Sequence, residues 1–237
     1  MLPDALVTLN GPCATVDPTS RIPVDGRDGV NDVTITAVLA LPAYLIGTFP
    51  TALLVARAGG HDVTTEGSGN PGASNVARIM GWKYGLLVMA IDALKGAIAA
   101  GAGLWLAGRG AAYVLGVLAV LGHTFPVTRG FKGGKGVATA GGVMAVLYPV
   151  IVVVLAVVWF LIARILKLAS VGSLVVAVLF PIAVAATGRP AWEIGITTAL
   201  ALVIVLRHLP NLRRLVRGEE LRTDGTPDGG DATDPPP

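Results

Sequence analysis

Long apolar stretches separated by short polar segments dominate this 237-residue chain. A helix that crosses a membrane needs about 20 consecutive, mostly apolar residues. Stretches that reach or approach this length lie at 33–56, 84–107, 111–128, 137–163, 168–187 and 191–207. The pattern therefore predicts an all-α fold, a polytopic integral membrane helix bundle.

The stretch 137–163 is ambiguous, because it fits either one tilted helix or two pieces separated at Tyr148-Pro149. Cytoplasmic connections of membrane proteins carry an excess of Lys and Arg. With the break included, the number of Lys and Arg residues alternates along the successive connections as three, one, three, none, two, one and five. This alternation favours seven spans, with the amino terminus outside and the carboxy terminus in the cytoplasm. The piece 136–148 is short enough to dip into the membrane instead of crossing it.

The two ends of the chain differ from the apolar middle. Residues 1–32 contain four prolines and several Asp residues without a core pattern, so we expect a mobile polar leader and no secretory signal peptide. Residues 218–237 are rich in Gly, Asp and Pro, and we expect a disordered tail. Residues 33–217 then form one membrane domain.

Composition supports a membrane protein. Hydrophobic residues make up 53% of the chain and charged residues 14%, whereas a soluble domain carries about 25% charged residues. The formal net charge is only +3, and we expect no nucleic-acid partner. The single cysteine, Cys13, excludes an intramolecular disulfide framework and any multi-cysteine metal site.

The first of two glycine-rich polar motifs runs from Gly67 to Asn75, with the sequence Gly-Ser-Gly-Asn-Pro-Gly-Ala-Ser-Asn, and Arg78 follows it. Glycine and proline favour a turn, and short hydroxyl and amide side chains offer hydrogen-bond donors beside it. A guanidinium can bind phosphate through two hydrogen bonds. The motif is typical of a phosphate-binding turn, although a tight interhelical loop with capping residues would use the same residue types.

The second motif combines Gly122-His123-Thr124-Phe125-Pro126 with residues 131–139, Phe-Lys-Gly-Gly-Lys-Gly-Val-Ala-Thr. Glycine N–H groups can approach an anion closely, and Lys132 and Lys135 supply positive charge. Because Gly136 follows the second lysine, the segment does not match a nucleotide P-loop. A basic loop attracted to anionic lipid head groups is the alternative, but that attraction does not need paired glycines.

Other polar residues lie in or beside the apolar stretches. Asp92 and Lys95 share one helix face, where we expect a structural ion pair inside the bundle, with a substrate contact as the alternative. His123 is expected to form a structural hydrogen bond. His208, with Asn211 three residues later, either binds or positions a hydroxyl group or anchors the chain at the membrane interface.

Several familiar catalytic patterns are missing from the sequence. It contains no His-x-x-x-x-Asp, no Gly-x-Ser-x-Gly elbow and no His/Cys cluster suited to zinc. We therefore expect no metal site and no other cofactor. An enzyme with this sequence would lack a conventional nucleophile.

In combination, these segments resemble the bacterial acyl-phosphate-dependent glycerol-3-phosphate acyltransferases. The resemblance covers about residues 33–220 and rests on both glycine-rich motifs, on Ala169-Ser170-Val171-Gly172-Ser173, and on His208-x-x-Asn211 with Arg214, Gly218 and Glu219 behind it. It implies that 33–217 is a seven-span acyltransferase domain that transfers a fatty acyl group from acyl phosphate to the 1-hydroxyl of sn-glycerol 3-phosphate. The product, 1-acylglycerol 3-phosphate (lysophosphatidic acid), begins phospholipid synthesis.

The resemblance also implies roles for individual residues. The acyl phosphate would be bound by Ser68, Gly69, Asn70, Ser74, Asn75, Gly133 and Gly134. Glycerol 3-phosphate would be held by Arg78, Lys135, Ser173, His208 and Asn211, of which Lys135, His208 and Asn211 would be catalytic. Both substrates, the lipid bilayer and the enzyme that supplies acyl phosphate are the implied partners.

The implied location is the bacterial cytoplasmic (inner) membrane. The charge alternation places both glycine-rich motifs, Ser173 and the segment 207–217 on the cytoplasmic side, where soluble phosphorylated metabolites are found. A transporter or channel for a phosphorylated solute is a competing interpretation, and a lipid-binding scaffold is another. An acyltransfer assay and a solute-flux assay would separate these three functions.

Overall fold

The structure is a computed structural model that describes residues 26–223. Its helices are α1 (Gly26–Thr48), α2 (Thr51–Ala58), α3 (Ala73–Met80), α4 (Trp82–Thr124), α5 (Val137–Leu147), α6 (Pro149–Ile165), α7 (Ala169–Ala186), α8 (Ala191–Arg207) and α9 (Leu209–Arg217), with a short 3₁₀ turn η1 (Val127–Arg129). The described part contains no β-strand, which confirms the all-α prediction.

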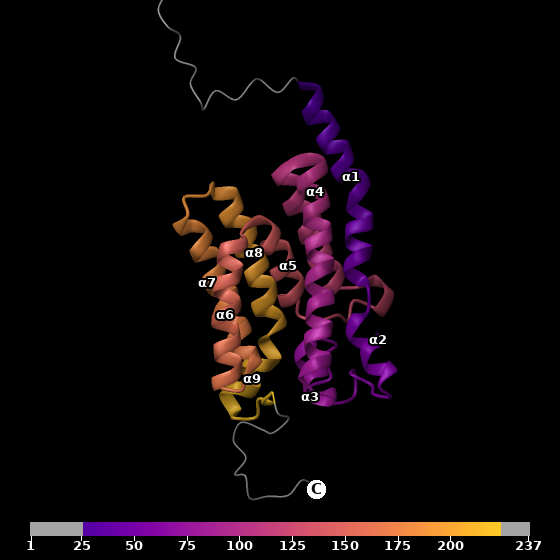
Figure 1. Cartoon of the computed structure of the whole chain (residues 1–237), viewed down its shortest axis with the longest axis vertical. Coiled ribbons are helices and arrows are strands. Elements are labelled where there is room, and N and C mark those ends of the chain that lie inside the picture. The colour runs from indigo at the N-terminus through magenta and orange to yellow at the C-terminus, as the bar shows by residue number, and fades with distance from the viewer. Residues whose placement is uncertain (1–25, 224–237) are drawn as a thin grey trace, which may run out of the picture.

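Helix α4 consists of two arms joined by a sharp bend. Ala107 (φ −147°, ψ 18°) and Gly108 (φ 79°, ψ −170°) leave the helical conformation, and the positive φ of Gly108 suits glycine. At Gly103 an added Cβ would lie 2.7 Å from backbone atoms of Ala111 and Ala112, so the two arms pack closely beside the bend. This bend separates the two apolar stretches predicted at 84–107 and 111–128, and it lies at the upper end of the molecule in Figure 1.

The predicted break at Tyr148-Pro149 is confirmed. Tyr148 has φ −143° and ψ 62°, and Pro149 begins α6, where its missing N–H costs nothing. Helix α5 has 11 residues and is therefore about 16 Å long, roughly half the hydrocarbon thickness of a bilayer.

Three helical segments are long and apolar enough to cross a membrane: Val30–Ala58, Trp82–Arg129 and Ala169–Ala186. A fourth results if Ala191–Arg207 and Leu209–Arg217, bent by 52°, count as one span. The described helices thus support a membrane bundle. The seven-span count and the orientation of the termini stay predictions.

The predicted ends of the membrane domain, at residues 33 and 217, stay a prediction. Helix α1 begins at Gly26, and the hydroxyl of Thr36 donates to the carbonyl of Asp32 within this helix. Residues 218–223 are also placed, because the Glu220 side chain is buried against α9. The remainder of the predicted leader and tail, 1–25 and 224–237, lies outside the described residues.

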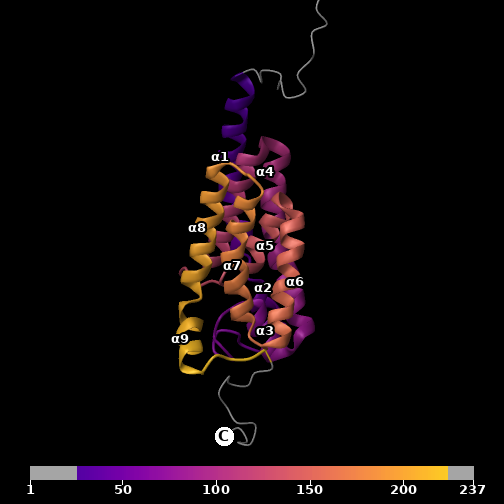
Figure 2. The same ribbon diagram turned by 90° about the vertical axis from the view of Figure 1, so that its left-hand side faces the viewer.

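Close helix packing relies on glycine. An added Cβ at Gly122 would lie 2.1 Å from the carbonyl oxygen of Tyr44, and one at Gly96 would lie 2.0 Å from that of Thr139. Small residues of this kind allow helix backbones to approach each other in membrane bundles. In the bundle as a whole, α3 and α9 lie at the same end, opposite the bend of α4 (Figures 1 and 2).

Candidate active site

Asn75 shapes the first glycine-rich motif from inside. Its Oδ1 accepts a hydrogen bond from the backbone N–H of Ser68 at 2.7 Å, and its Nδ2 donates to the carbonyls of Val63 and Glu66 at 3.1 and 3.0 Å. Gly67 has φ 60°, and a Cβ there would lie 2.4 Å from Asn75 Oδ1. The side-chain hydrogen bonds of Asn75 are therefore with the loop itself, and its expected contact with acyl phosphate stays a prediction.

The second glycine-rich motif is held by the end of α4. The N–H of Gly134 donates to the carbonyl of His123 at 3.1 Å, and the carbonyl of Gly133 accepts from Nη2 of Arg207 at 2.8 Å. A Cβ at Gly134 would lie 2.2 Å from the His123 ring, and one at Gly133 would lie 2.1 Å from its carbonyl oxygen. These glycines permit close packing on His123. The Gly134 N–H thus bonds within the protein, its expected contact with acyl phosphate stays a prediction, and Lys135 of the same loop lines a cavity.

The start of α7 carries two buried hydroxyl groups. Ser173 Oγ donates to the carbonyl of Ala169 at 2.9 Å and accepts from Nε1 of Trp159 at 3.1 Å. Ser170 Oγ is buried and has no hydrogen-bond partner among the described residues. Ser170 lines the same cavity as Ser173, so an unused donor faces that space.

His208 and Asn211 lie at the junction of α8 and α9, and each is 2% exposed. Nδ1 of His208 is 2.8 Å from the carbonyl oxygen of Ile204, and because a carbonyl can only accept, this nitrogen carries the proton. In the neutral ring Nε2 is then an acceptor. Asn211 Nδ2 donates to Glu220 Oε1 at 2.6 Å, whereas Asn211 Oδ1 lacks a partner in the described structure.

Residues 218–223 close the site from the carboxy-terminal side. Glu220 Oε2 accepts from Nε of Arg214 at 2.8 Å, and the side chain of Glu220 is fully buried. Arg78 donates through Nε and Nη2 to the carbonyls of Arg222 and Leu221, both at 2.9 Å. Nη1 of Arg78 takes no part in these two hydrogen bonds.

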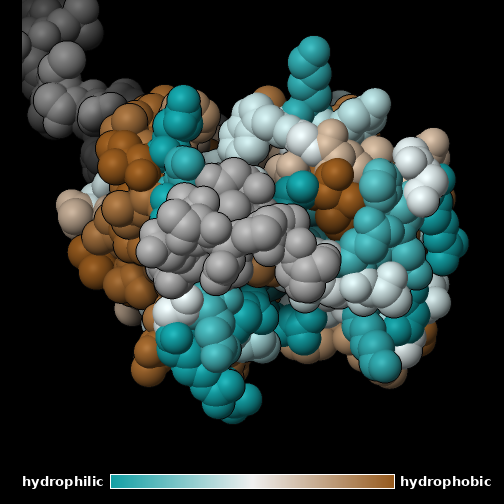
Figure 3. All heavy atoms as spheres, turned by 90° about the horizontal axis from the view of Figure 1, so that it is seen from below, coloured by the Kyte–Doolittle hydropathy of each residue, from teal (hydrophilic) through white to brown (hydrophobic). Residues whose placement is uncertain are grey.

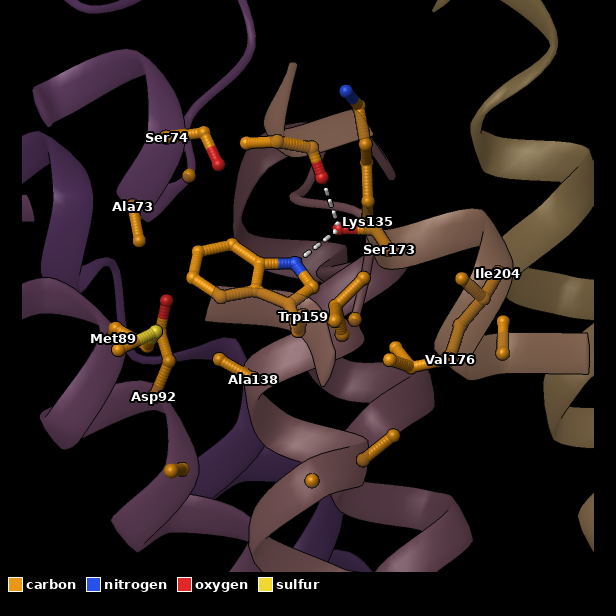
Figure 4. A pocket seen from close by; sticks show the side chains of 18 of the residues that line it. Ala73, Ser74, Met89, Asp92, Lys135, Ala138, Trp159, Ser173, Val176 and Ile204 are labelled. Carbon is orange, nitrogen blue, oxygen red and sulfur yellow. Dashed lines mark hydrogen bonds between the residues drawn. The ribbon is translucent and has the colours of Figure 1, made fainter. Parts of the chain in front are cut away.

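One cavity of about 580 Å³ brings these elements together. Among the residues predicted from the sequence, it is lined by Ser68, Asn70, Ser74, Asn75, Arg78, Lys135, Ser173, His208 and Asn211. Gly69, Gly133 and Gly134 do not line it. Away from the polar groups the lining is apolar, with Met89, Leu155, Trp159, Val176, Phe180 and Ile204, several of which are visible in Figure 4.

Positive charge exceeds negative charge at the polar end of the cavity. Lys135 forms no hydrogen bond or ion pair with another described residue, and burial lowers its pKa to about 8 despite the attraction of Glu220. Burial lowers the pKa of Arg78 as well. Glu220 is the nearby carboxylate, and it is already bound by Arg214 and Asn211. Partly buried cations that lack a counter-ion favour an anionic ligand.

The Asp92 cluster behaves as the structural ion pair that the sequence predicts. Asp92 Oδ1 lies 2.7 Å from Lys95 Nζ, which also donates to the carbonyl of Phe49 at 2.9 Å. His123 Nδ1 is 3.5 Å from the same ammonium nitrogen. The pair is thus fixed by α1, α4 and the second motif, although Asp92 also reaches the cavity wall.

No group of three or more potential metal ligands occurs within residues 26–223. The cations and hydroxyls that line the cavity are suited to binding and aligning phosphorylated molecules. Seen from the end at which α3 and α9 lie, hydrophilic side chains gather on the face of the molecule (Figure 3), so this end suits a water-soluble substrate.

The comparison with known proteins agrees with this geometry. The family model described as glycerol-3-phosphate acyltransferase matches residues 37–218. The chain belongs to the glycerol-3-phosphate acyltransferase family. Among its relatives, the glycerol-3-phosphate acyltransferase of Geobacter sulfurreducens is 39% identical over 200 residues, which cover 81% of this chain and 98% of the relative. Glycerol-3-phosphate acyltransferase 1 of Deinococcus radiodurans is 42% identical over 198 residues, which cover 80% and 97%.

Two solved structures of this family resemble the fold. Both are crystal structures of PlsY, an integral membrane glycerol 3-phosphate acyltransferase, in its glycerol 3-phosphate and lysophosphatidic acid forms. The first has a TM-score of 0.75 and the second 0.73; each is 35% identical and covers 79% of this chain and 94% of the crystallised one. The family prediction made from the motifs is thereby confirmed.

Sequence reasoning missed three residues of the site. Ser170 lies inside the segment Ala169–Ser173 that carried part of the resemblance, and this position in the sequence could have identified it as a site residue. Glu220 follows Gly218-Glu219, which was noted, but it was assigned to the tail. Trp159 lies in a uniformly apolar stretch, which gives no sign of its contact with Ser173.

Proposed function

We propose that this family member transfers a fatty acyl group from acyl phosphate to the 1-hydroxyl of sn-glycerol 3-phosphate. The observation that carries the proposal is the cavity itself. Its polar end is rich in cations and hydroxyls, it offers no Cys or Ser-His-Asp nucleophile among its lining residues, and its other end is apolar. Such a site suits a donor that is already activated and that carries both a phosphate and an acyl chain.

Two phosphate groups would occupy the polar end. Ser68, Asn70 and Ser74 from the first motif contact the acyl phosphate, and Asn75 holds that motif in shape. Lys135, Arg78, Ser173, His208 and Asn211 hold glycerol 3-phosphate. The cations offset the repulsion between the two anions, and the acyl chain lies along the apolar lining.

The reaction needs no covalent intermediate with the protein. The oxygen of the 1-hydroxyl attacks the acyl carbonyl carbon, and the carbon–oxygen bond to phosphate breaks. The leaving phosphate takes the bonding electron pair and, in this mechanism, also the hydroxyl proton. Nε2 of His208 is positioned as an acceptor for a hydroxyl of the same substrate, because its Nδ1 proton is held by Ile204.

A donor comparison tests this function. Purified protein in detergent is supplied with glycerol 3-phosphate and with acyl phosphate, acyl-CoA or acyl carrier protein that carry the same acyl chain. We expect 1-acylglycerol 3-phosphate from acyl phosphate alone. Turnover of acyl-CoA at a comparable rate would refute the donor assignment. With the protein reconstituted in sealed vesicles, flux of glycerol 3-phosphate without acyl transfer would favour a transporter.

The membrane arrangement forms part of the proposal. We infer seven spans in the bacterial inner membrane, with the amino terminus outside and the cavity open to the cytoplasm, where an acyl-phosphate-producing enzyme would be a partner. Reporters fused after Lys135, Lys167 and Arg217 should report the cytoplasm, and one after Arg109 the outside. A cytoplasmic signal at Lys135 combined with an outside signal at Arg217 would exclude this topology.

A further inference from the structure

The indole of Trp159 reaches from α6 into the middle of the cavity. In Figure 4 it lies between Ser74 and Met89 on one side and Ser173 and Val176 on the other. Its Nε1 donates to Ser173 Oγ at 3.1 Å. A tryptophan N–H can only donate a hydrogen bond. It therefore binds a lone pair of the serine oxygen and leaves the serine O–H proton available for another acceptor.

Two neighbouring elements fix the position of this ring. Trp82, at the start of α4, stacks on Trp159 with ring centroids 6.5 Å apart and planes inclined by 18°. On α7, a Cβ at Gly172 would lie 3.1 Å from Cδ1 of Trp159, so the absence of a side chain there allows the indole to lie against the helix. The N–H therefore points at Ser173 from a ring whose place is set by α4, α6 and α7.

The hydroxyl of Ser173 points to the backbone of its own helix, α7, in this structure. Its proton goes to the carbonyl of Ala169, four residues earlier, so the group offers no donor to a ligand. An ionised phosphate oxygen can only accept hydrogen bonds, so a serine that binds it must donate its hydroxyl proton. Rotation about the Cβ–Oγ bond would redirect the proton to a phosphate while the oxygen stays in place, and Trp159 could keep its hydrogen bond throughout because it binds a lone pair.

We propose that Trp159 is a positioning residue of the glycerol 3-phosphate site, whose indole N–H holds the Ser173 oxygen while the hydroxyl proton turns from Ala169 to the phosphate. The inference rests on the proposed role of Ser173 in binding this substrate. It does not depend on the identity of the acyl donor, since glycerol 3-phosphate binding can be measured alone.

The test replaces the N–H and retains the ring. Trp159→Phe keeps an aromatic group beside Trp82, and site-specific incorporation of 3-benzothienylalanine at position 159 keeps the full bicyclic shape with sulfur in place of N–H. Loss of one neutral hydrogen bond should raise the Kd for glycerol 3-phosphate by about threefold to tenfold, measured by calorimetry without acyl donor. In the acyltransfer assay, KM for glycerol 3-phosphate should rise equally, with kcat and the KM for the acyl donor nearly unchanged.

Trp192→Phe is the matched control. Trp192 packs edge-on against Tyr113 with ring centroids 5.1 Å apart, at the opposite end of the bundle, and its N–H forms no hydrogen bond with a described residue. We expect this variant to bind glycerol 3-phosphate like the unmodified protein. An equal rise in Kd for both variants would mean that a general loss of packing, and not the N–H at position 159, is responsible, which would overturn the proposal.

A double-mutant cycle with Ser173→Ala separates positioning from packing. If Trp159 acts through Ser173, then removing its N–H should have no effect in the Ser173→Ala background. The same loss in both backgrounds, or an unchanged Kd in the benzothienylalanine protein, would refute the role of Trp159 while leaving the proposed function intact. An unchanged Kd in Ser173→Ala itself would refute both the serine's binding role and the inference built on it.

Discussion

Polar groups gather at both ends of this bundle, but they are satisfied very differently. At the end where α4 bends, the carboxylate of Glu193 accepts from Arg109 at 2.8 and 2.9 Å and from the phenols of Tyr113 and Tyr148. The guanidinium of Arg109 also lies over the Tyr148 ring, 4.9 Å from its centroid. In the cavity at the other end, Lys135 forms no ion pair with any of the described residues.

The contrast shows how a structural polar cluster differs from a binding site. The Glu193 cluster pairs one carboxylate with the guanidinium of Arg109, and both carboxylate oxygens accept hydrogen bonds from within the protein. The cavity keeps unused groups: the ammonium of Lys135, Ser170 Oγ and Asn211 Oδ1. Buried polar groups without partners are costly, and a ligand that satisfies them recovers that cost.

Removal of Glu193 should give the largest effect, on stability. Glu193→Ala leaves Arg109, Tyr113 and Tyr148 without their shared acceptor, and breaking a buried ion pair from one side costs about 3 kcal/mol. We expect a clearly lower Tm in detergent, with an unchanged KM for glycerol 3-phosphate in the protein that remains folded. Glu219→Ala removes an exposed carboxylate and serves as the control. An unaltered Tm would show that the cluster does not stabilise the fold.

Removal of the Lys135 ammonium should affect activity and not stability. A hydrogen bond to a charged group is worth roughly 1.5–3 kcal/mol, and about 1.4 kcal/mol corresponds to one decade in rate. Lys135→Ala should therefore lower kcat/KM about tenfold to a hundredfold at an unchanged Tm. Lys132→Ala, an exposed lysine of the same loop, should have little effect. Equal activities of the two variants would leave Lys135 without a role in the site.

The lowered pKa of Lys135 predicts that kcat/KM depends on pH. Because burial lowers the pKa of Lys135 to about 8, the free protein loses this charge as the pH rises through 8. A bound phosphate stabilises the ammonium, so kcat/KM should fall by about tenfold between pH 7 and 9 while kcat at saturating substrate falls less. Lys135→Ala should not show this alkaline fall. A profile in Lys135→Ala that matches the unmodified protein would assign the titration to another group.

Loss of the Ser170 hydroxyl should give the smallest effect. Its oxygen is buried, lines the cavity and lacks a partner among the described residues, so substrate binding would supply its first hydrogen bond. Ser170→Ala should raise KM for glycerol 3-phosphate about threefold. Thr198→Ala, whose exposed hydroxyl donates to Ile194 on α8, is the control. If Ser170→Ala binds as tightly as the unmodified protein, that hydroxyl does not reach the phosphate.

The sequence predicted local features better than distant contacts. The apolar stretches, the break at Tyr148-Pro149 and the glycine-rich motifs are visible as runs and spacings, because helices and turns depend on neighbouring residues. The Glu193 cluster joins residues that are 35 to 84 positions apart, and no local pattern marks them. It was therefore missed entirely.

Roles within the motifs were harder to predict than the motifs. Glycine next to lysine suggests a phosphate loop, yet the Gly134 N–H bonds to the His123 carbonyl, and of Gly133, Gly134 and Lys135 only Lys135 lines the cavity. Asn75 similarly holds its own loop. Whether a donor faces a ligand or the protein depends on tertiary packing. The break between α1 and α2 and the burial of Glu220 also depend on contacts that the sequence pattern does not show.

A structure of the protein bound to glycerol 3-phosphate would test the central claim most directly. We predict density for the phosphate at the polar end of the cavity, within about 2.7–3.2 Å of Lys135 Nζ, and none at the Glu193 cluster. An empty cavity at saturating substrate, or a phosphate bound at the Arg109 end instead, would contradict the account.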